Sequence, residues 1–129
     1  MNAIETPVGL PFADAEAAIR EALTKQGFGV LTEIDVSANL NGKLGTSRPP
    51  LKILGACNPQ LADRALNIDP TVSLLLPCNI VLEAVSDGTR VAAADPRELM
   101  SDPAFAELAA NAASLLQEAI DEVSAKTQG

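Results

Sequence analysis

The spacing of hydrophobic residues changes several times along the chain, and each change predicts a new element. Residues 3–8 fit a short strand. Over residues 11–26 the apolar positions recur every three or four residues, which predicts an amphipathic helix. Gly27 suits the end of that helix, because glycine readily adopts the left-handed conformation found there. The buried stripe of the helix is expected to consist of Ala15, Ala18, Ile19, Ala22 and Leu23.

Hydrophobic and polar residues alternate over positions 28–36, which predicts a half-buried strand. The alternation stops at residues 37–50, where Asn, Gly, Lys, Ser and paired prolines predict a long loop with room for one helical turn at its start. One face of the strand is expected to carry Phe28, Val30, Thr32, Ile34 and Val36, and the other Leu31, Glu33 and Asp35.

The next segment predicts a strand, a short helix and a second strand. Residues 51–56 form a buried apolar run, and Asn58-Pro59 supplies the cap and the first residue of a helix. Residues 73–85 are strand-like, with Pro77 at an edge, a bulge or a strand start, because proline cannot donate to a sheet ladder. The inner side of the short helix is expected to carry Leu61, Ala62, Ala65 and Leu66.

A hairpin and a long helix complete the chain. Asp87-Gly88 is a two-residue turn signal that pairs residues 80–85 with residues 89–94. Two Asp-Pro pairs mark further helix starts, and the second of them opens a helix over residues 103–125. Its apolar seam is expected to consist of Phe105, Leu108, Ala112, Leu115, Ala119 and Val123.

These elements together predict the fold class. A hairpin requires antiparallel pairing, so a doubly wound parallel sheet is excluded. We expect an α+β protein, a two-layer sandwich with a mixed or mostly antiparallel sheet of about five strands and helices packed on one face. No repeat or linker interrupts the pattern, so residues 1–129 are expected to form a single domain. The other sheet face must meet solvent or a second subunit, which favours a homodimer.

Composition and charge exclude several classes of partner. Nine basic and seventeen acidic residues give a net charge of −8, so the surface repels nucleic acid. Aromatic residues make up only 2% of the chain, which leaves few rings for stacking on bases or flat cofactors. No apolar run approaches the roughly 20 residues that cross a bilayer, and no secretory signal is visible. We therefore expect a cytoplasmic protein with no membrane partner and with reduced cysteines.

The chain contains no histidine, and this excludes much catalytic chemistry. Without histidine, the chain lacks the commonest general base and the usual haem ligand. It also cannot form most zinc sites or any nucleophile that a histidine activates. Segment 42–47 has the letters of a phosphate-binding loop in the wrong order, so a nucleotide enzyme of that kind is excluded by spacing. The sequence therefore favours a non-enzymatic protein, predicts no catalytic residue and no metal site of established spacing, and indicates no particular cofactor.

Cys57 and Cys78 are the strongest candidates for residues that carry chemistry. Each precedes an asparagine, Asn58 or Asn79, and lies at a strand boundary beside a proline-containing turn. The helix start after Cys57 would favour a thiolate, because unpaired N–H groups and the helix dipole stabilise negative charge. If the two strands are neighbours, the thiols would form a redox pair or a soft-metal site. The alternative is that both cysteines are small buried hydrophobes.

Lys43, Arg48 and Lys52 are the one basic cluster in an acidic chain. With backbone N–H groups of the glycine- and serine-containing loop, they would bind a small anion such as a phosphate or carboxylate. A solvated loop whose charges balance nearby acids is the alternative. Glu33 and Asp35, two residues apart, would either divide acid and base roles or protect a sheet edge from aggregation.

Three strings resemble the family called domain of unknown function 302: GFGVLTEIDV at 27–36, ILGACNP at 53–59 and LLLPCN at 74–79. KLG at 43–45 and the Asp-Pro pair at Asp95 are similar to the same pattern, and the resemblance covers residues 11–125. It implies a compact α/β domain, often independent and dimeric and sometimes fused to redox or membrane segments. It implies no particular activity, substrate or cofactor. This chain differs in showing no signal or anchor, so no role outside the cytosol is expected. The family motifs map onto Lys43, Gly45, Cys57, Asn58, Pro59, Pro77, Cys78 and Asn79.

Two functional hypotheses follow. The first is a non-enzymatic homodimeric binding domain for a small anionic or sulfur-containing ligand, with its pocket where the loop at 43–52 meets the helix start after Cys57. The second is a protein that uses Cys57 and Cys78 for redox chemistry, persulfide transfer or soft-metal handling. A structural subunit without a ligand is a third possibility.

Overall fold

The computed structural model describes residues 2–126, in which five strands form one sheet. Each neighbouring pair of these strands is antiparallel, so the predicted α+β class is confirmed. Their order across the sheet is β1-β5-β4-β3-β2. The strands are β1 (Ala3–Val8), β2 (Gly29–Asp35), β3 (Leu51–Cys57), β4 (Cys78–Val85) and β5 (Gly88–Ala94).

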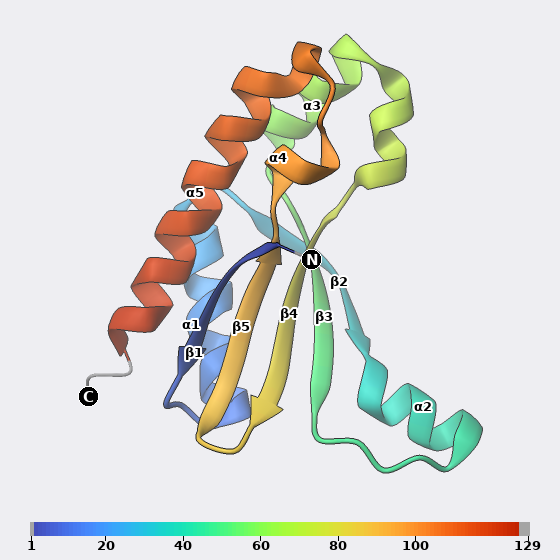
Figure 1. The fold of residues 1–129 in the computed structure, drawn as a ribbon, viewed down its shortest axis with the longest axis vertical. Coiled ribbons are helices and arrows are strands. Elements are labelled where there is room, and N and C mark those ends of the chain that lie inside the picture. The colour runs from blue at the N-terminus through green and yellow to red at the C-terminus, as the bar shows by residue number, and fades with distance from the viewer. Residues whose placement is uncertain (1, 127–129) are drawn as a thin grey trace.

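Two long helices cover one face of this sheet. They are α1 (Phe12–Lys25) and α5 (Ala106–Ala125), which pack against each other and against the strands. In Figure 1, α1 lies behind the sheet and α5 runs along its β1 side. Within residues 2–126, none of the helices is long and apolar enough to cross a membrane. The observed layers are therefore the predicted ones, a sheet with helices on one side.

The shorter helices lie beyond the two ends of the strands (Figure 1). At the end where β2 stops lies α2 (Val36–Leu44). At the opposite end lie α3 (Pro59–Ile68), α4 (Pro96–Leu99) and two 3-10 turns, η1 (Pro70–Leu75) and η2 (Pro103–Phe105). The molecule thus has a helix-covered face, an open sheet face and two differently built ends.

The core lies between the sheet and the two long helices, and aliphatic and small side chains fill it. The buried stripe of α1 is the predicted one. Alanines on both helices allow a close approach to the sheet at little cost in side-chain entropy. On α5 the predicted seam is only partly confirmed, because Leu115 is half-buried and Phe105 lies in η2, before the helix begins. The seam is also broader than predicted, since it adds Ala109, Ala113, Leu116 and Ile120. The largest fully buried side chains include Ile19, Leu23, Leu54, Ile80, Leu82, Leu116 and Ile120.

The alternation predicted for β2 is interrupted by a β-bulge. The pairing register with β3 shifts between Val30 and Thr32, so Leu31 is an extra residue on this edge strand. Val30 packs against the core, whereas Ile34 faces the open side and is 48% exposed. The prediction of one shared face from Phe28 to Val36 is therefore wrong, because a single inserted residue reverses the direction of every side chain after it.

Two further segments differ from their predictions. Residues 36–44 form a nine-residue helix rather than one turn. Asp35 caps it by accepting a hydrogen bond from the Ala38 N–H at 2.9 Å, and Gly45, with φ of 70°, ends it. Residues 70–75 form a 3-10 turn rather than the beginning of a strand, and β4 starts directly after Pro77. Both helical segments are short and mostly exposed, so burial does not require apolar residues at helical spacing in them. The sequence therefore carries no periodic signal for either segment.

The β4–β5 hairpin is confirmed, with its turn one residue earlier than predicted. Val85 pairs with Gly88, so Ser86 and Asp87 form the turn. Gly88 has φ of 147°, and a Cβ there would collide with the carbonyl oxygen of Val8 on β1. Glycine is therefore required where β1 crosses the start of β5.

We predict that Gly88→Ala lowers the free energy of unfolding by about 1–3 kcal/mol or more, because a backbone oxygen cannot move aside. Gly42→Ala is the matched control, because a Cβ at this site inside α2 meets nothing within 4 Å. The control should stabilise the protein by roughly 0.5–1 kcal/mol. Urea unfolding followed by circular dichroism measures both changes. Equal midpoints for Gly88→Ala and the wild type would contradict the close approach of β1.

Candidate functional site

The two cysteines of the predicted thiol site lie at adjacent strand ends. Cys57 is the last residue of β3, Cys78 is the first residue of β4, and Ala56 pairs with Cys78 in the register. A strand spacing of about 4.8 Å and a rise of about 3.3 Å per residue place the two Cα atoms roughly 6 Å apart. Both residues are free, half-buried thiols. The antiparallel pairing of β3 and β4 thus brings the two cysteines to neighbouring strand ends.

Both cysteines line one pocket between the strand ends, α3 and α5. No charged side chain is present among the described residues that form its walls. Its cavity volume is about 30 Å³, room for about two water molecules or one ion. Pockets for metabolites are larger, about 300–1,000 Å³. The remaining lining residues are Phe28, Ala56, Asn58, Leu61, Ala62, Ala65, Leu76, Met100, Leu108 and Ala112.

The environment of this pocket disfavours negative charge. Burial raises the pKa of the Cys78 thiol, and the nearby Cys57 thiol raises it further, because two neighbouring thiolates repel each other. Cys78 is therefore protonated at neutral pH unless a positive charge compensates. A ligand that stabilises both thiolates must itself bring positive charge into the pocket.

Asn58 is a structural residue at the wall of this pocket. Its Oδ1 accepts a hydrogen bond from the Leu61 N–H at 3.2 Å and caps α3. Its Nδ2 donates to the Gln26 carbonyl at 3.3 Å, just after α1. Asn79, the other predicted asparagine, lines a different hollow on the open side of β4 and β5. The structure therefore places only one of the two asparagines beside the thiols.

Met100 also lines this pocket, although no motif in the sequence predicts a site residue there. It follows α4, is 9% exposed and reaches the pocket from a third segment of the chain. The sequence carries one weak signal for it, because the chain contains only two methionines. Methionine is a common filler of apolar cores, so its type alone does not indicate a site.

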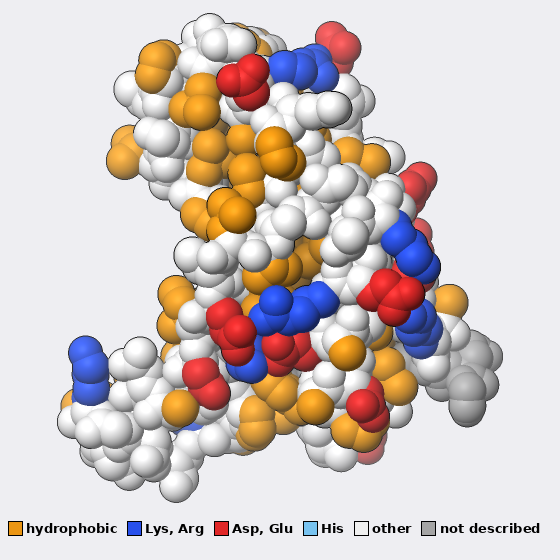
Figure 2. Space-filling view, turned by 180° about the vertical axis from the view of Figure 1, so that it is seen from behind, with side chains coloured by type: hydrophobic (Ala, Val, Ile, Leu, Met, Phe, Trp, Pro, Cys, Tyr) orange, Lys and Arg blue, Asp and Glu red, His pale blue; other side chains and the backbone are white. Residues whose placement is uncertain are grey.

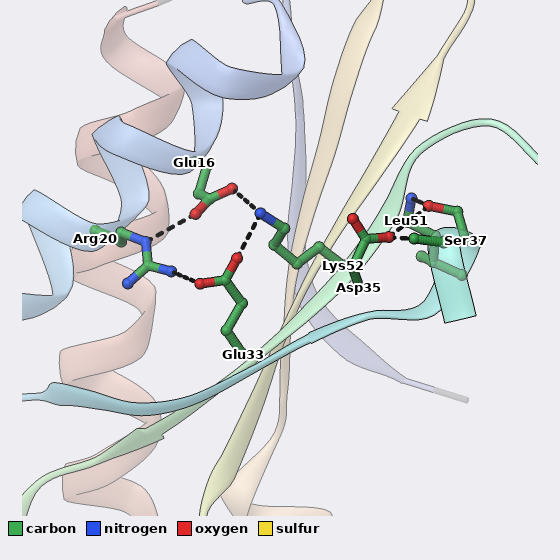
Figure 3. Close-up of polar contacts among 8 residues, drawn as sticks. Glu16, Arg20, Glu33, Asp35, Ser37, Leu51 and Lys52 are labelled. Atoms are coloured by element: carbon green, nitrogen blue, oxygen red, sulfur yellow. Dashed lines mark hydrogen bonds and ion pairs between the residues drawn. The ribbon is translucent and has the colours of Figure 1, made fainter. Parts of the chain in front are cut away.

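The predicted basic cluster is divided in the structure. Lys52 points toward α1, where its Nζ lies 2.8 Å from Glu16 Oε1 and 2.7 Å from Glu33 Oε1 (Figure 3). Lys43 is exposed in the last turn of α2. Arg48 borders a shallow hollow whose walls contain neither of the two lysines. Anion binding by Lys43 and Arg48 stays a prediction, whereas the charge of Lys52 is neutralised by two carboxylates.

Lys52 belongs to a ring of four alternating charges that joins α1, β2 and β3. Arg20 closes the ring, with Nε 2.9 Å from Glu16 Oε2 and Nη2 2.9 Å from Glu33 Oε2. Figure 3 shows the four side chains directed toward one another, and Figure 2 shows basic and acidic side chains gathered side by side on the helix-covered face. The ring ties the edge strand β2 to the core elements.

These contacts also define the charge states of the ring. Burial raises the pKa of Glu16, but hydrogen bonds from Lys52 and Arg20 outweigh it, so the net shift is downward. Hydrogen bonds to Glu16 and Glu33 raise the pKa of Lys52. Asp35 takes no part, because its carboxylate accepts hydrogen bonds from the Ala38 N–H and the Ser37 hydroxyl, which lower its pKa. Glu33 and Asp35 therefore have separate structural roles.

The loop and the thiols lie at opposite ends of β3 (Figure 1). This strand runs from Leu51, next to the loop, to Cys57, and its seven residues span roughly 20 Å. The prediction of one pocket where the loop meets the helix start after Cys57 is therefore wrong. An extended strand separates residues that are close in the sequence.

Replacing Lys52→Met should lower the free energy of unfolding by about 1.5–3 kcal/mol at neutral pH, because two carboxylates lose a charged donor. The contribution of the ring is complete between the ordinary values of 4.5 for Glu16 and 10.5 for Lys52. It is lost as the pH falls through the lowered pKa of Glu16 or rises through the raised pKa of Lys52. Urea unfolding at neutral pH and well below pH 4.5 should show the difference shrinking in acid. Lys43→Met, an exposed control on α2, should change little at either pH, and an equal loss in both variants would contradict the role of the ring.

Comparison with known proteins gives a family. Residues 4–123 match the family model described as "Domain of unknown function DUF302". A solved structure, described as an uncharacterized conserved protein DUF302 from Bacillus stearothermophilus, superposes with a TM-score of 0.88 at 31% sequence identity. The match covers 95% of this chain and 98% of that chain. No curated protein matches the chain. The resemblance carried by the ILGACNP and LPCN strings is confirmed, and the chain belongs to the DUF302 family.

Proposed function

We propose that this chain is a small non-enzymatic binding domain that holds one soft metal ion between the thiols of Cys57 and Cys78. The observation that carries the proposal is their position at one apolar pocket with room for an ion and not for a metabolite. Thiolates are soft ligands and select soft cations. A cation also supplies the positive charge that two neighbouring thiolates need in an apolar environment.

The surroundings of Cys57 support this choice. Asn58 caps α3, a helix of ten residues, so Cys57 directly precedes the positive end of the helix dipole. This partial charge offsets the negative charge that remains when two thiolates bind a monovalent cation. Among residues 2–126, no group of three or more His, Cys, Asp or Glu is arranged to hold a metal ion. The ion therefore depends on the two thiols together with a donor of another kind.

The structure gives less support to an anionic ligand. The thiol pocket has no charged side chain among its described lining residues, and Lys52 is engaged with Glu16 and Glu33. An anion site would consist of Lys43 and Arg48 alone, on exposed chain. Redox chemistry and persulfide transfer use the same two thiols, so the tests of metal binding also bear on them.

We predict that the reduced protein binds one equivalent of Cu(I) per chain in anaerobic competition with a chromogenic Cu(I) chelator. Cys57→Ser and Cys78→Ser should each weaken binding at least about 100-fold, because a serine hydroxyl is a poor ligand for a soft cation. Cys57→Ser combined with Ser86→Cys is the matched control, because it keeps two thiols but places one in the exposed β4–β5 turn. The proposal would be refuted if this control bound Cu(I) with wild-type affinity, or if the wild-type protein bound no Cu(I).

We also propose that two copies of this chain pair through the open face of the sheet. This face carries apolar side chains. Of the strands, β3 is the one that α2 contacts substantially. None of the residues of α2 is buried, and its Leu44 is 71% exposed. Figure 1 shows α2 and the loop after it projecting past the end of the sheet. The apolar residues of the open face include Ile34, Leu51, Ile53, Val81, Val85 and Ala92.

The size and the charges of this face fit a second copy. Five strands spaced about 4.8 Å apart, each rising about 3.3 Å per residue, present roughly 500 Å², and α2 extends the surface toward the ~800 Å² that each partner of a standard interface buries. Glu83 and Arg90 lie opposite each other on the face, 3.6 Å apart. A two-fold axis would let each copy offer both charges to the other.

Leu44→Lys is expected to shift the protein from dimer toward monomer, because it replaces an exposed apolar side chain of α2, the extension of the proposed interface, with a charge. Leu74→Lys is the matched control, since this leucine is 87% exposed and lies in η1, at the opposite end of the molecule. Native mass spectrometry and light scattering at micromolar concentration measure the subunit number. A wild-type monomer, or equal dissociation by both variants, would refute pairing through this face.

A further inference from the structure

We propose that the thioether of Met100 completes a three-sulfur site with Cys57 and Cys78, and that this site takes Cu(I) in preference to Zn(II). The inference rests on the proposed metal binding by the two thiols. Its basis is that three sulfur-bearing residues line one pocket although they come from three separate segments: the end of β3, the start of β4 and the residue after α4.

Several contacts hold Met100 in its place. Its N–H donates to the Pro96 carbonyl at 2.9 Å, at the end of α4. Asp95 caps α4 by accepting from the Arg97 N–H at 3.0 Å, and its carboxylate pairs with the Arg97 guanidinium at 2.7 Å. The Met100 side chain also packs in a second buried cluster with Ala65, Val72, Phe105, Leu108 and Ala109. Met100 is therefore part of an ordered wall.

The donor set distinguishes the two metals. Structural Zn(II) sites are tetrahedral and take four ligands from thiolate, imidazole and carboxylate. Among the described lining residues, this pocket has two thiols, one thioether and the amide of Asn58, which is already engaged with Leu61 and Gln26. A neutral thioether is a soft ligand that suits Cu(I). A cavity of about 30 Å³ holds about two water molecules or one ion, so a bound ion and the water that would complete a zinc site compete for the same space.

The binding step conserves charge and electrons. Two S–H bonds break, both protons leave to solvent, and each thiolate donates an electron pair to Cu(I). The Met100 sulfur donates a third pair without losing a proton. Copper and sulfur keep their oxidation states, so no oxidant or reductant is consumed. Because two protons are released, binding should strengthen as the pH rises.

The experiment follows the methionine methyl groups of the full-length reduced protein by NMR, after labelling with 13C-methyl methionine. The chain has two methionines, Met1 and Met100, so Met100→Leu assigns both signals. One equivalent of Cu(I), added anaerobically, should shift the Met100 signal and leave the other unchanged, whereas Zn(II) should not shift it. Met100→Leu, which conserves volume and should fold normally, is expected to bind Cu(I) about 10–100-fold more weakly than the wild type.

The outcomes separate the two proposals. If wild-type protein takes up no Cu(I), the proposed function and the inference both fail. If it binds Cu(I) through the cysteines while the Met100 methyl signal and the affinity of Met100→Leu stay unchanged, only the inference fails. Zn(II) binding as tight as Cu(I) binding would also overturn it. Should Met100→Leu not fold, the methyl shift in the wild-type protein decides the question.

Discussion

The packing of α1 and α5 against one face of the antiparallel sheet is the interaction on which the rest of the structure depends. Fully burying one aliphatic side chain contributes about 1.5–3 kcal/mol, and the core contains several, among them Ile19, Leu82 and Leu116. Alanines at the remaining contacts keep the helices close to the strands. Because both long helices lie on the same side, the opposite face stays open and the strand ends are closed by other elements.

The two strand ends consequently differ in chemistry. At one end α3 and α5 close over Cys57 and Cys78 and leave a small apolar pocket. At the other end α2 contacts mainly β3 and exposes its surface. The chain uses β3 to keep these features apart, so the proposed metal site and the projecting α2 can act independently.

Ion pairs also keep two basic residues away from the thiol pocket. Arg20 and Lys52 are neutralised inside the ring with Glu16 and Glu33, and they hold β2 on the sheet. The thiol pocket has no compensating cation among its described walls. A net charge of −8 over the whole chain attracts cations toward the surface. The negative field of the chain and the two thiols both support the proposed binding of a cation.

Local patterns in the sequence predicted the elements in which burial imposes a regular spacing of apolar residues. The stripe of α1, the hairpin of β4 and β5, and the cap at Asn58-Pro59 could all be predicted, because each depends on residues close together in the chain. Contacts between distant segments alone place the bulge at Leu31, pair Lys52 with two carboxylates and bring Met100 to the pocket of the two cysteines. These features arise between segments far apart in sequence, where packing and pairing register set the contacts and no local pattern records them.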